Sequence, residues 1–206
     1  MIIGIIDLGI NNLSSVINAF SSHLELSDSL HVISGPEHTL VPDLIVVPGL
    51  GKFNAGMTEL RSRDMIPSIN NWNENGSKFV GICLGMQLLG TTSTESEGIP
   101  GLNLVPGRIV RLEKSTDNRV PHTGWARALK IHTSNLFPSL EQEGDFYFTH
   151  SFAVTGVNEQ TISTSFHGEV FTSALSANNV FGVQFHPEKS QKYGEKLLAN
   201  FCEMGS

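Results

Sequence analysis

The chain has 206 residues, a formal net charge of −7 and a hydrophobic content of 39%. This length favours one domain, residues 1–206, which can bury roughly 70% of the surface of the unfolded chain. No run of basic residues is visible, so nucleic acid phosphates are not expected as a ligand.

The N-terminal segment and the cysteines give no sign of export or membrane insertion. Residues 2–6 are too few for the apolar region of a signal peptide, and no basic segment precedes them. No apolar run reaches the length of a transmembrane helix. The two cysteines lie in different contexts and do not suggest a disulfide framework. We therefore expect a cytoplasmic protein that does not bind membranes.

Short apolar runs alternate with helical stretches in the first half of the chain. Strands are expected at residues 2–6, 31–34, 44–47 and 78–82. Helices are expected at residues 13–24, 57–60, 65–72 and 86–89. Continuous apolar strands separated by helices predict a central, mostly parallel sheet with helices on both faces. The fold class is therefore α/β.

The second half of the chain has a different pattern, in which strands follow one another with short turns. They are expected at residues 104–112, 124–131, 146–152, 161–165, 170–175 and 180–185. This pattern predicts antiparallel strands added to the parallel sheet. The polar run 91–98 is read as a loop, and an amphipathic helix over residues 190–202 closes the chain.

A candidate nucleophile lies between the strand at 78–82 and the helix that follows it. Cys83 has a glycine two residues before it and another two residues after it, Gly81 and Gly85. This is the pattern of a strand-to-helix elbow, with sulfur in place of the usual hydroxyl. The elbow would aim the N–H of Leu84 at a developing oxyanion, and the helix N-terminus favours a thiolate. A buried structural thiol is the alternative for such a cysteine.

A candidate base follows the strand at 180–185. His186 could take the thiol proton, and Glu188 could hold its imidazole in the productive tautomer. Because ligands of open α/β sheets gather beyond the carboxyl ends of the strands, Cys83 and His186 should converge on one edge. The strand at 44–47 ends at the same edge, and the glycines that follow it, Gly49 and Gly51, suit an oxyanion hole. A tight turn is the structural alternative there.

The chain resembles the class I, triad-type glutamine amidotransferases, and most closely their HisH branch, the glutaminase subunits of imidazole glycerol phosphate synthase. The matching segments follow one another in order along nearly the whole chain. They are residues 7–13, 47–53, 81–87, 121–125, 147–152 and 182–190. The Gly-x-Cys-x-Gly and His-Pro-Glu pair marks the superfamily. Pro-Gly-Leu-Gly at 48–51, Pro-His-x-Gly-Trp at 121–125 and His-Pro-Glu-Lys-Ser at 186–190 mark the branch.

The resemblance implies roles for further residues. The oxyanion would be stabilised by Gly49, Leu50, Gly51 and Leu84, with Leu50 as the residue that flips on activation. L-Glutamine would be bound by Gly51, Gln87, His150, Ser151 and Phe152. A solvent-facing Gln87 is the alternative, and Phe152 stands where the family often has tyrosine. No metal and no cofactor are implied, and the spacing of the histidines and cysteines suggests no metal site.

Ammonia released into water is protonated and lost as a nucleophile, so the acceptor site is expected on a second polypeptide. In the family this partner is HisF, a (β/α)8 barrel that makes imidazole glycerol phosphate and an aminoimidazole carboxamide ribotide. Asn12, Trp125 and Lys189 match family positions that face the barrel; for Lys189 a solvated surface charge is the alternative. The sequence departs from the family pattern at Asn11, Thr123 and Ala126, all expected on the same partner face.

Three other functions fit parts of the sequence. A HisH-like paralogue that supplies ammonia for surface-polysaccharide sugar amidination would share every motif. A stand-alone cysteine hydrolase would keep Cys83 and His186 but would not need Gln87, and it should turn over without a partner. A non-catalytic module would typically have lost a triad residue, and none is lost here.

Overall fold

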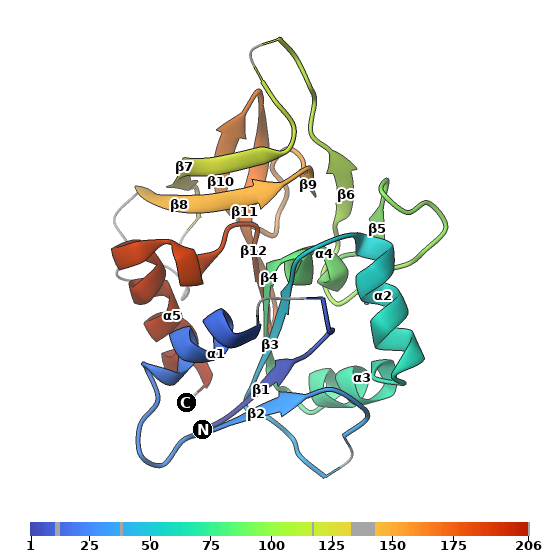
Figure 1. The fold of residues 1–206 in the computed structure, drawn as a ribbon, viewed down its shortest axis with the longest axis vertical. Helices are drawn as coiled ribbons and strands as arrows, with labels where there is room; N and C mark the ends of the chain where they lie inside the picture. Colours follow the sequence, from blue (N-terminus) through green and yellow to red (C-terminus); the bar gives the residue numbers. More distant parts are fainter. Residues whose placement is uncertain (11–12, 38, 117, 133–142, 206) are drawn as a thin grey trace.

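A nine-stranded mixed sheet forms the centre of the molecule in the computed structural model, which describes residues 1–10, 13–37, 39–116, 118–132 and 143–205 (Figure 1). In sheet order the strands are β2 (Ser29–Ile33), β1 (Ile2–Ile6), β3 (Leu44–Gly49), β4 (Lys78–Cys83), β12 (Val180–Val183), β11 (Glu169–Ala177), β10 (Thr161–His167), β7 (His122–Lys130) and β8 (Glu143–His150). The five strands from β2 to β12 pair in parallel, and those from β12 to β8 pair antiparallel. The predicted α/β class and the added antiparallel strands are confirmed.

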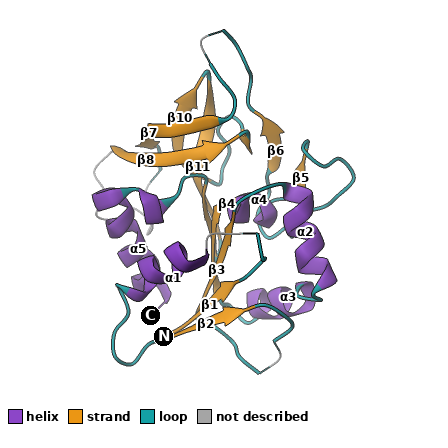
Figure 2. Ribbon diagram, in the orientation of Figure 1, coloured by secondary structure: helices purple, strands orange, loops and turns teal. Residues whose placement is uncertain are grey.

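Helices cover both faces of the parallel part of the sheet (Figure 2). α1 (Leu13–Ser21) and α5 (Gln191–Gly205) pack on one face, where Phe20 and Phe201 belong to the same apolar core. α2 (Phe53–Ser62), α3 (Ile66–Glu74) and α4 (Leu84–Leu89) pack on the other, around Met57 and Trp72. Two cores separated by a sheet explain why the residues of β3 are buried throughout.

Several element boundaries differ from the predictions. α1 ends at Ser21, because His23 and Leu24 donate their backbone N–H groups to carbonyls three residues back, as in a tightening last turn. Leu24 still packs against the core, so its spacing from the other apolar residues reflects burial and not membership of the helix. The predicted strand at 104–112 begins only at Arg108. Leu102 and Leu104 instead bond to carbonyls of α4.

The predicted strand at 146–152 is divided between two sheets. β8 ends at His150, and β9 (Phe152–Val154) starts a second, three-stranded sheet with β6 (Arg108–Arg111) and β5 (Thr92–Ser93). The short strand β5 lies inside the run predicted to be a loop. The change of sheet places Ser151 at the junction, where its carbonyl accepts the N–H of Leu112 just beyond β6.

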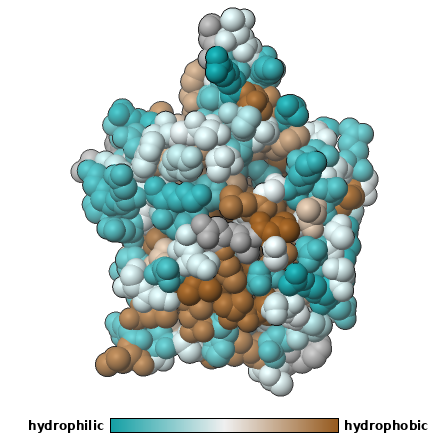
Figure 3. Space-filling view, viewed as in Figure 1, coloured by the Kyte–Doolittle hydropathy of each residue, from teal (hydrophilic) through white to brown (hydrophobic). Residues whose placement is uncertain are grey.

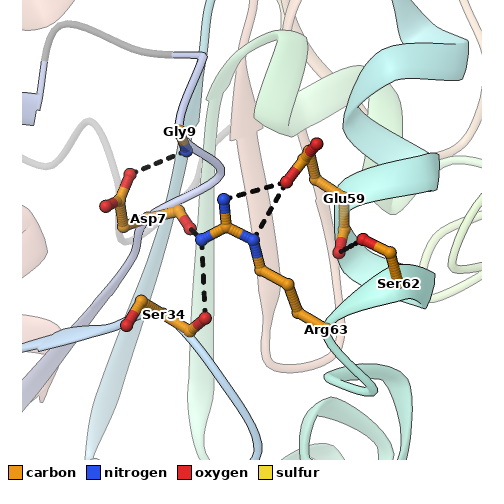
Figure 4. A network of polar contacts seen from close by, with 6 residues as sticks. All are labelled: Asp7, Gly9, Ser34, Glu59, Ser62 and Arg63. Carbon is orange, nitrogen blue, oxygen red and sulfur yellow. Dashed lines mark hydrogen bonds and ion pairs between the residues drawn. The ribbon is translucent and has the colours of Figure 1, made fainter.

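The loop after β1 is held in place by the side chain of Arg63, the residue that caps the C-terminus of α2 (Figure 4). Arg63 donates to the backbone carbonyls of Asp7 and Ser34, at 3.0 and 3.4 Å, and pairs with Glu59 one turn earlier on α2, at 2.8 Å. The carboxylate of Asp7 accepts a hydrogen bond from the N–H of Gly9. These contacts set the path of the chain that leads to residues 11–12, which lie outside the described part.

Apolar surface gathers in the middle of one face of the molecule, and hydrophilic side chains surround it (Figure 3). This is the face on which α1 and the strands β1 and β3 are seen in Figure 1. No helix within the described ranges is both long enough and apolar enough to cross a membrane.

Candidate active site

The nucleophile candidate lies in a strained turn between β4 and α4. Cys83 has φ 54° and ψ −108°, a backbone conformation that costs a non-glycine residue about 1–3 kcal/mol. Close packing holds the turn. A Cβ on Gly85 would lie 1.6 Å from the carbonyl oxygen of Val47, and a Cβ on Gly81 would lie 2.6 Å from the backbone of Met86. The two glycines therefore allow contacts that no other residue could make.

The base candidate and its carboxylate are buried together. His186 follows β12 and Glu188 lies in the short 3-10 helix η1 (Pro187–Lys189). The Nδ1 atom of His186 lies 2.8 Å from an oxygen of Glu188, and the two side chains are only 3% and 4% exposed. Because a carboxylate can only accept at neutral pH, Nδ1 carries the proton and Nε2 is the basic nitrogen of the neutral ring.

The environment of His186 favours its protonated form. Burial lowers its pKa, but interactions with Cys83 and with Glu188 outweigh burial and raise the pKa above its ordinary value. In the described part of the chain, Nε2 is buried and makes no hydrogen bond. This arrangement suits a thiolate–imidazolium pair.

The strand order brings the predicted glycine segment beside the nucleophile. β3 lies between β1 and β4, and its last residue, Gly49, pairs with Cys83 in the register. A Cβ on Gly49 would come within 3.0 Å of the side chain of Leu84. Gly51 has φ +115°, in the region that favours glycine. The turn from Gly49 to Gly51 therefore runs alongside the elbow.

A cavity of about 310 Å³ opens at this edge of the sheet. It is lined by Leu50, Gly51, Cys83, Leu84, Gln87, Glu95, Arg111, Pro121, Thr149, His150, Ser151 and Phe152. All the predicted glutamine-binding residues are in this set. Gln87 is 6% exposed and donates to the backbone carbonyl of Phe152, so it does not face solvent.

Four residues of the cavity were not predicted: Glu95, Arg111, Pro121 and Thr149. Glu95 lies in the polar run read as a loop, and its carboxylate accepts a hydrogen bond from the N–H of Phe53 at 2.8 Å. Arg111 ends β6 and places its guanidinium 5.7 Å from the ring centre of Phe152. The sequence around a single polar side chain does not indicate that this side chain lines a cavity, because only the tertiary structure brings it to the elbow.

Of the three residues predicted to face a partner, two are exposed and the third lies outside the part of the chain that the structure describes. Trp125 is 50% exposed on β7, and its ring lies 6.1 Å from that of Tyr147 on β8. Lys189 is exposed, with Nζ 5.9 Å from the same tyrosine ring. Asn12 and Asn11 lie outside the described residues. We call the cluster of Trp125, Tyr147 and Lys189 the aromatic patch.

Side chains along β7 point alternately to its two faces, and this alternation shows that one expectation about the partner face was wrong. Thr123 and Trp125 are exposed, but Ala126 points to the other side and packs against the core. His122 also points inward and is 4% exposed. Successive residues of a strand face opposite sides, so a motif of consecutive residues cannot lie on one surface. The segment 121–126 therefore serves both the interior and the surface.

Comparison with known proteins agrees with this geometry. The profile of the family "Glutamine amidotransferase class-I" matches residues 5–204. The "Imidazole glycerol phosphate synthase subunit HisH" of Pectobacterium atrosepticum is 42% identical over 202 residues, which cover 97% of this chain and 98% of that protein. The protein of the same name from Methanothermobacter thermautotrophicus is 37% identical over 204 residues, which cover 98% of each chain.

Solved structures show the same fold at low sequence identity. A crystal structure of a glutamine amidotransferase superposes with a TM-score of 0.75 at 16% identity and covers 98% of each chain. A chain of PurLQS from Thermotoga maritima gives a TM-score of 0.73 at 15% identity and covers 98% of this chain and 97% of its own length. By sequence and by fold, this chain belongs to the class-I glutamine amidotransferase family and, within it, to the HisH group.

Proposed function

We propose that the chain hydrolyses the side-chain amide of L-glutamine, as the glutaminase subunit of an imidazole glycerol phosphate synthase in histidine biosynthesis. The relatives that bear this name match it over nearly their whole length. The observation that carries the proposal is the strained Cys83, which opens into a cavity that also holds a carboxylate and a guanidinium. Glu95 and Arg111 provide opposite charges for the ammonium and carboxylate of a free α-amino acid.

The chemistry follows from the side chains at the elbow. The thiol proton of Cys83 passes to Nε2 of His186, and the thiolate attacks the amide carbon of glutamine. The C–N bond breaks as His186 returns the proton to the leaving ammonia. The glutamyl thioester that remains is hydrolysed by a water that His186 deprotonates, which releases glutamate. Glu188 keeps Nδ1 of His186 protonated and stabilises the imidazolium in both steps.

The backbone around the elbow is suited to stabilise the tetrahedral oxyanion. The N–H of Leu84 is at the first position of α4, where helical N–H groups have no partner within the helix. A second donor would come from the turn at Gly49, Leu50 and Gly51, which runs beside Cys83. Rotation of a peptide in this turn would bring that donor into place, so the isolated chain should be nearly inactive until a partner binds.

The aromatic patch is the proposed docking point of a HisF-like (β/α)8 partner. It is tied directly to the base: the carbonyl of Tyr147 accepts the N–H of His186 at 2.9 Å. The hydroxyl of Ser190 accepts the N–H of Tyr147 and donates to the carbonyl of His186. A partner that presses on Trp125, Tyr147 or Lys189 would therefore act on the backbone of His186. An acidic partner side chain would pair with Lys189.

The test is a glutaminase assay of the chain alone, with HisF, and with HisF plus its nucleotide substrate. We expect glutamate release only with the partner, and most with its substrate present. High turnover by the chain alone would rule out the gated subunit and support a stand-alone cysteine hydrolase. Activation by a sugar-amidinating HisF-like enzyme, but not by HisF, would assign the chain to surface-polysaccharide synthesis instead.

A further inference from the structure

A buried glutamine lies against the nucleophile. Gln184 is 0% exposed and follows β12, two residues before His186. Its Nε2 lies 3.8 Å from the sulfur of Cys83. Its backbone N–H donates to the carbonyl of Ser173 on β11, so the main chain that carries it is fixed to the sheet. Gln184 has no part in the proton transfers between Cys83, His186 and the substrate.

The orientation of the Gln184 amide is set by its other neighbour. Gln87 donates from Nε2 to the carbonyl of Phe152 at 2.8 Å, and this carbonyl can only accept. The same nitrogen lies 3.1 Å from Oε1 of Gln184. A rotated Gln184 amide would set two NH2 groups against each other and direct its oxygen at the thiolate. The nitrogen of Gln184 is therefore directed at the sulfur.

The carbonyl of Phe152 is also contacted by His150, which is in turn contacted by His122. Nδ1 of His150 lies 3.0 Å from this oxygen and must carry the proton, so Nε2 of His150 is an acceptor. It lies 3.1 Å from Nδ1 of His122, which is therefore the donor. The ring of His122 is stacked between Phe148 and His167, with ring centres 4.9 and 4.0 Å away. Burial above all lowers the pKa of His122 to about 4 and of His150 to about 3, so both are neutral at pH 7.

These contacts form one buried chain of hydrogen bonds from His122 to Cys83. The sulfur has one neighbour that can only accept a hydrogen bond and one that can donate. The thiol can donate to the carbonyl of Thr149, 3.9 Å away, whereas the donor on Gln184 forms a stronger hydrogen bond with a thiolate than with a thiol. None of these histidines belongs to a cluster arranged to bind a metal among the residues described.

We propose that Gln184 is a further catalytic residue, which stabilises the thiolate of Cys83 by donating a hydrogen bond, and that Gln87 and the His150–His122 pair are positioning residues for this donor. The inference rests on the proposed nucleophilic role of Cys83. When the S–H bond breaks, the proton goes to His186 and the negative charge stays on sulfur, beside the Gln184 amide. A purely structural role, in which buried amides satisfy one another, predicts a loss of stability without a change in the reactivity of Cys83.

The test is the rate of alkylation of Cys83 by iodoacetamide as a function of pH, because the thiolate is the species that reacts. All variants carry Cys202→Ala, so that Cys83 is the single thiol. Gln184→Met keeps the shape of the side chain and removes the donor. Since a hydrogen bond to a charged group is worth about one pKa unit, we expect the midpoint of the profile to rise by about one unit and alkylation below it to fall about tenfold.

Two further comparisons between variants distinguish the effect of the Gln184 donor from the effect of the residues that orient it. The first compares Gln184→Glu with Gln184→Met, and the second compares His122→Phe with His122→Asn. Gln184→Glu places an acceptor and a negative charge beside the sulfur and should raise the midpoint further than Gln184→Met. His122→Phe keeps the ring stack but removes the Nδ1 donor, and should shift the midpoint in the same direction by less. His122→Asn keeps a donor near that position and should return the profile toward the parent. His186, Glu188, His150, Glu95 and Arg111, the titratable groups around the sulfur and its cavity, are unchanged in the Gln184 variants.

A profile of folded Gln184→Met that superimposes on the parent would overturn the proposal, whether or not its melting temperature is lower. If Gln184→Met does not fold, a pair of identical profiles for His122→Phe and His122→Asn would overturn it equally. The assay needs neither glutamine nor a partner. An inactive glutaminase with a shifted alkylation profile would therefore contradict the proposed function while supporting this inference.

Discussion

The two walls of the cavity are built in different ways. The wall that carries Cys83, Leu84 and Gln87 comes from five consecutive residues, and its shape is set by the strained turn and the glycines packed against it. The other wall, from Thr149 to Phe152, comes from the junction of two sheets and is held by hydrogen bonds to two distant residues, Gln87 and His122. Local strain therefore places the nucleophile, whereas long-range polar contacts place the wall that faces the substrate.

The largest expected effect is on the chemistry of the first wall. Cys83→Ala should lower kcat by at least about 10³-fold, because no other group among the cavity residues can form the thioester. The measurement is glutamate release with the activating partner present. Cys202→Ala is the matched control, since this second thiol is buried in the core away from the cavity. Turnover of the Cys83 variant near the parent's would show that the nucleophile is misassigned.

The next effect tests whether the first wall depends on close packing. Gly85→Ala places a methyl group 1.6 Å from the carbonyl of Val47 and should destabilise the fold by about 3 kcal/mol or more. Gly35→Ala is the control, because a Cβ there meets nothing within 4 Å. It should change stability by less than about 1 kcal/mol. Chemical denaturation of both variants gives the comparison, and equal stabilities would refute the packing argument.

The second wall should be the more sensitive of the two to acid. His122 and His150 have folded-state pKa values lowered to about 4 and about 3 from 6.5, so the unfolded chain binds more protons below pH 6.5. Each histidine should therefore remove ~1.4 kcal/mol of stability per pH unit as the pH falls below 6.5, and nothing above it. Urea unfolding at neutral and mildly acidic pH measures this slope.

The control for the acid effect is His122→Asn, which keeps a hydrogen-bond donor but cannot be protonated. Its stability should fall less steeply between neutral pH and about pH 5 than that of the parent, by ~1.4 kcal/mol per unit over this range. Carboxylates contribute equally to both proteins and cancel in the difference. Identical slopes would show that His122 is not held neutral by the fold.

The smallest expected effect concerns long-range polar contacts outside the cavity. Arg63→Met removes the donors to the carbonyls of Asp7 and Ser34 and should cost about 1–2 kcal/mol. Ser62→Ala, whose hydroxyl bonds only to an exposed carbonyl on the same helix, should cost less than about 0.5 kcal/mol. If the partner face depends on this loop, Arg63→Met should also weaken activation by the partner, which a titration of glutaminase activity measures.

Much of the fold could be predicted because its signals are local. The apolar runs that became β1, β3 and β4 are continuous in the sequence, and burial on both faces of a parallel sheet requires this composition. The ends of elements were less predictable. Leu24 continues the helical spacing beyond the end of α1, since a side chain can pack on the core from a turn as well as from a helix.

The sequence by itself determined the elbow at Cys83, because the glycines that permit its strained backbone lie within two residues of it. It also indicated that the elbow, the Gly49 turn and His186 lie at one edge of the sheet, since each motif follows its strand directly. Only the tertiary structure decided that Glu95 and Arg111 enter the cavity, that His122 faces inward while Trp125 faces out, and that Gln184 points at the sulfur. The physical reason is that these positions depend on hydrogen bonds and packing between residues far apart in the chain, and such contacts leave no periodicity or spacing in the sequence.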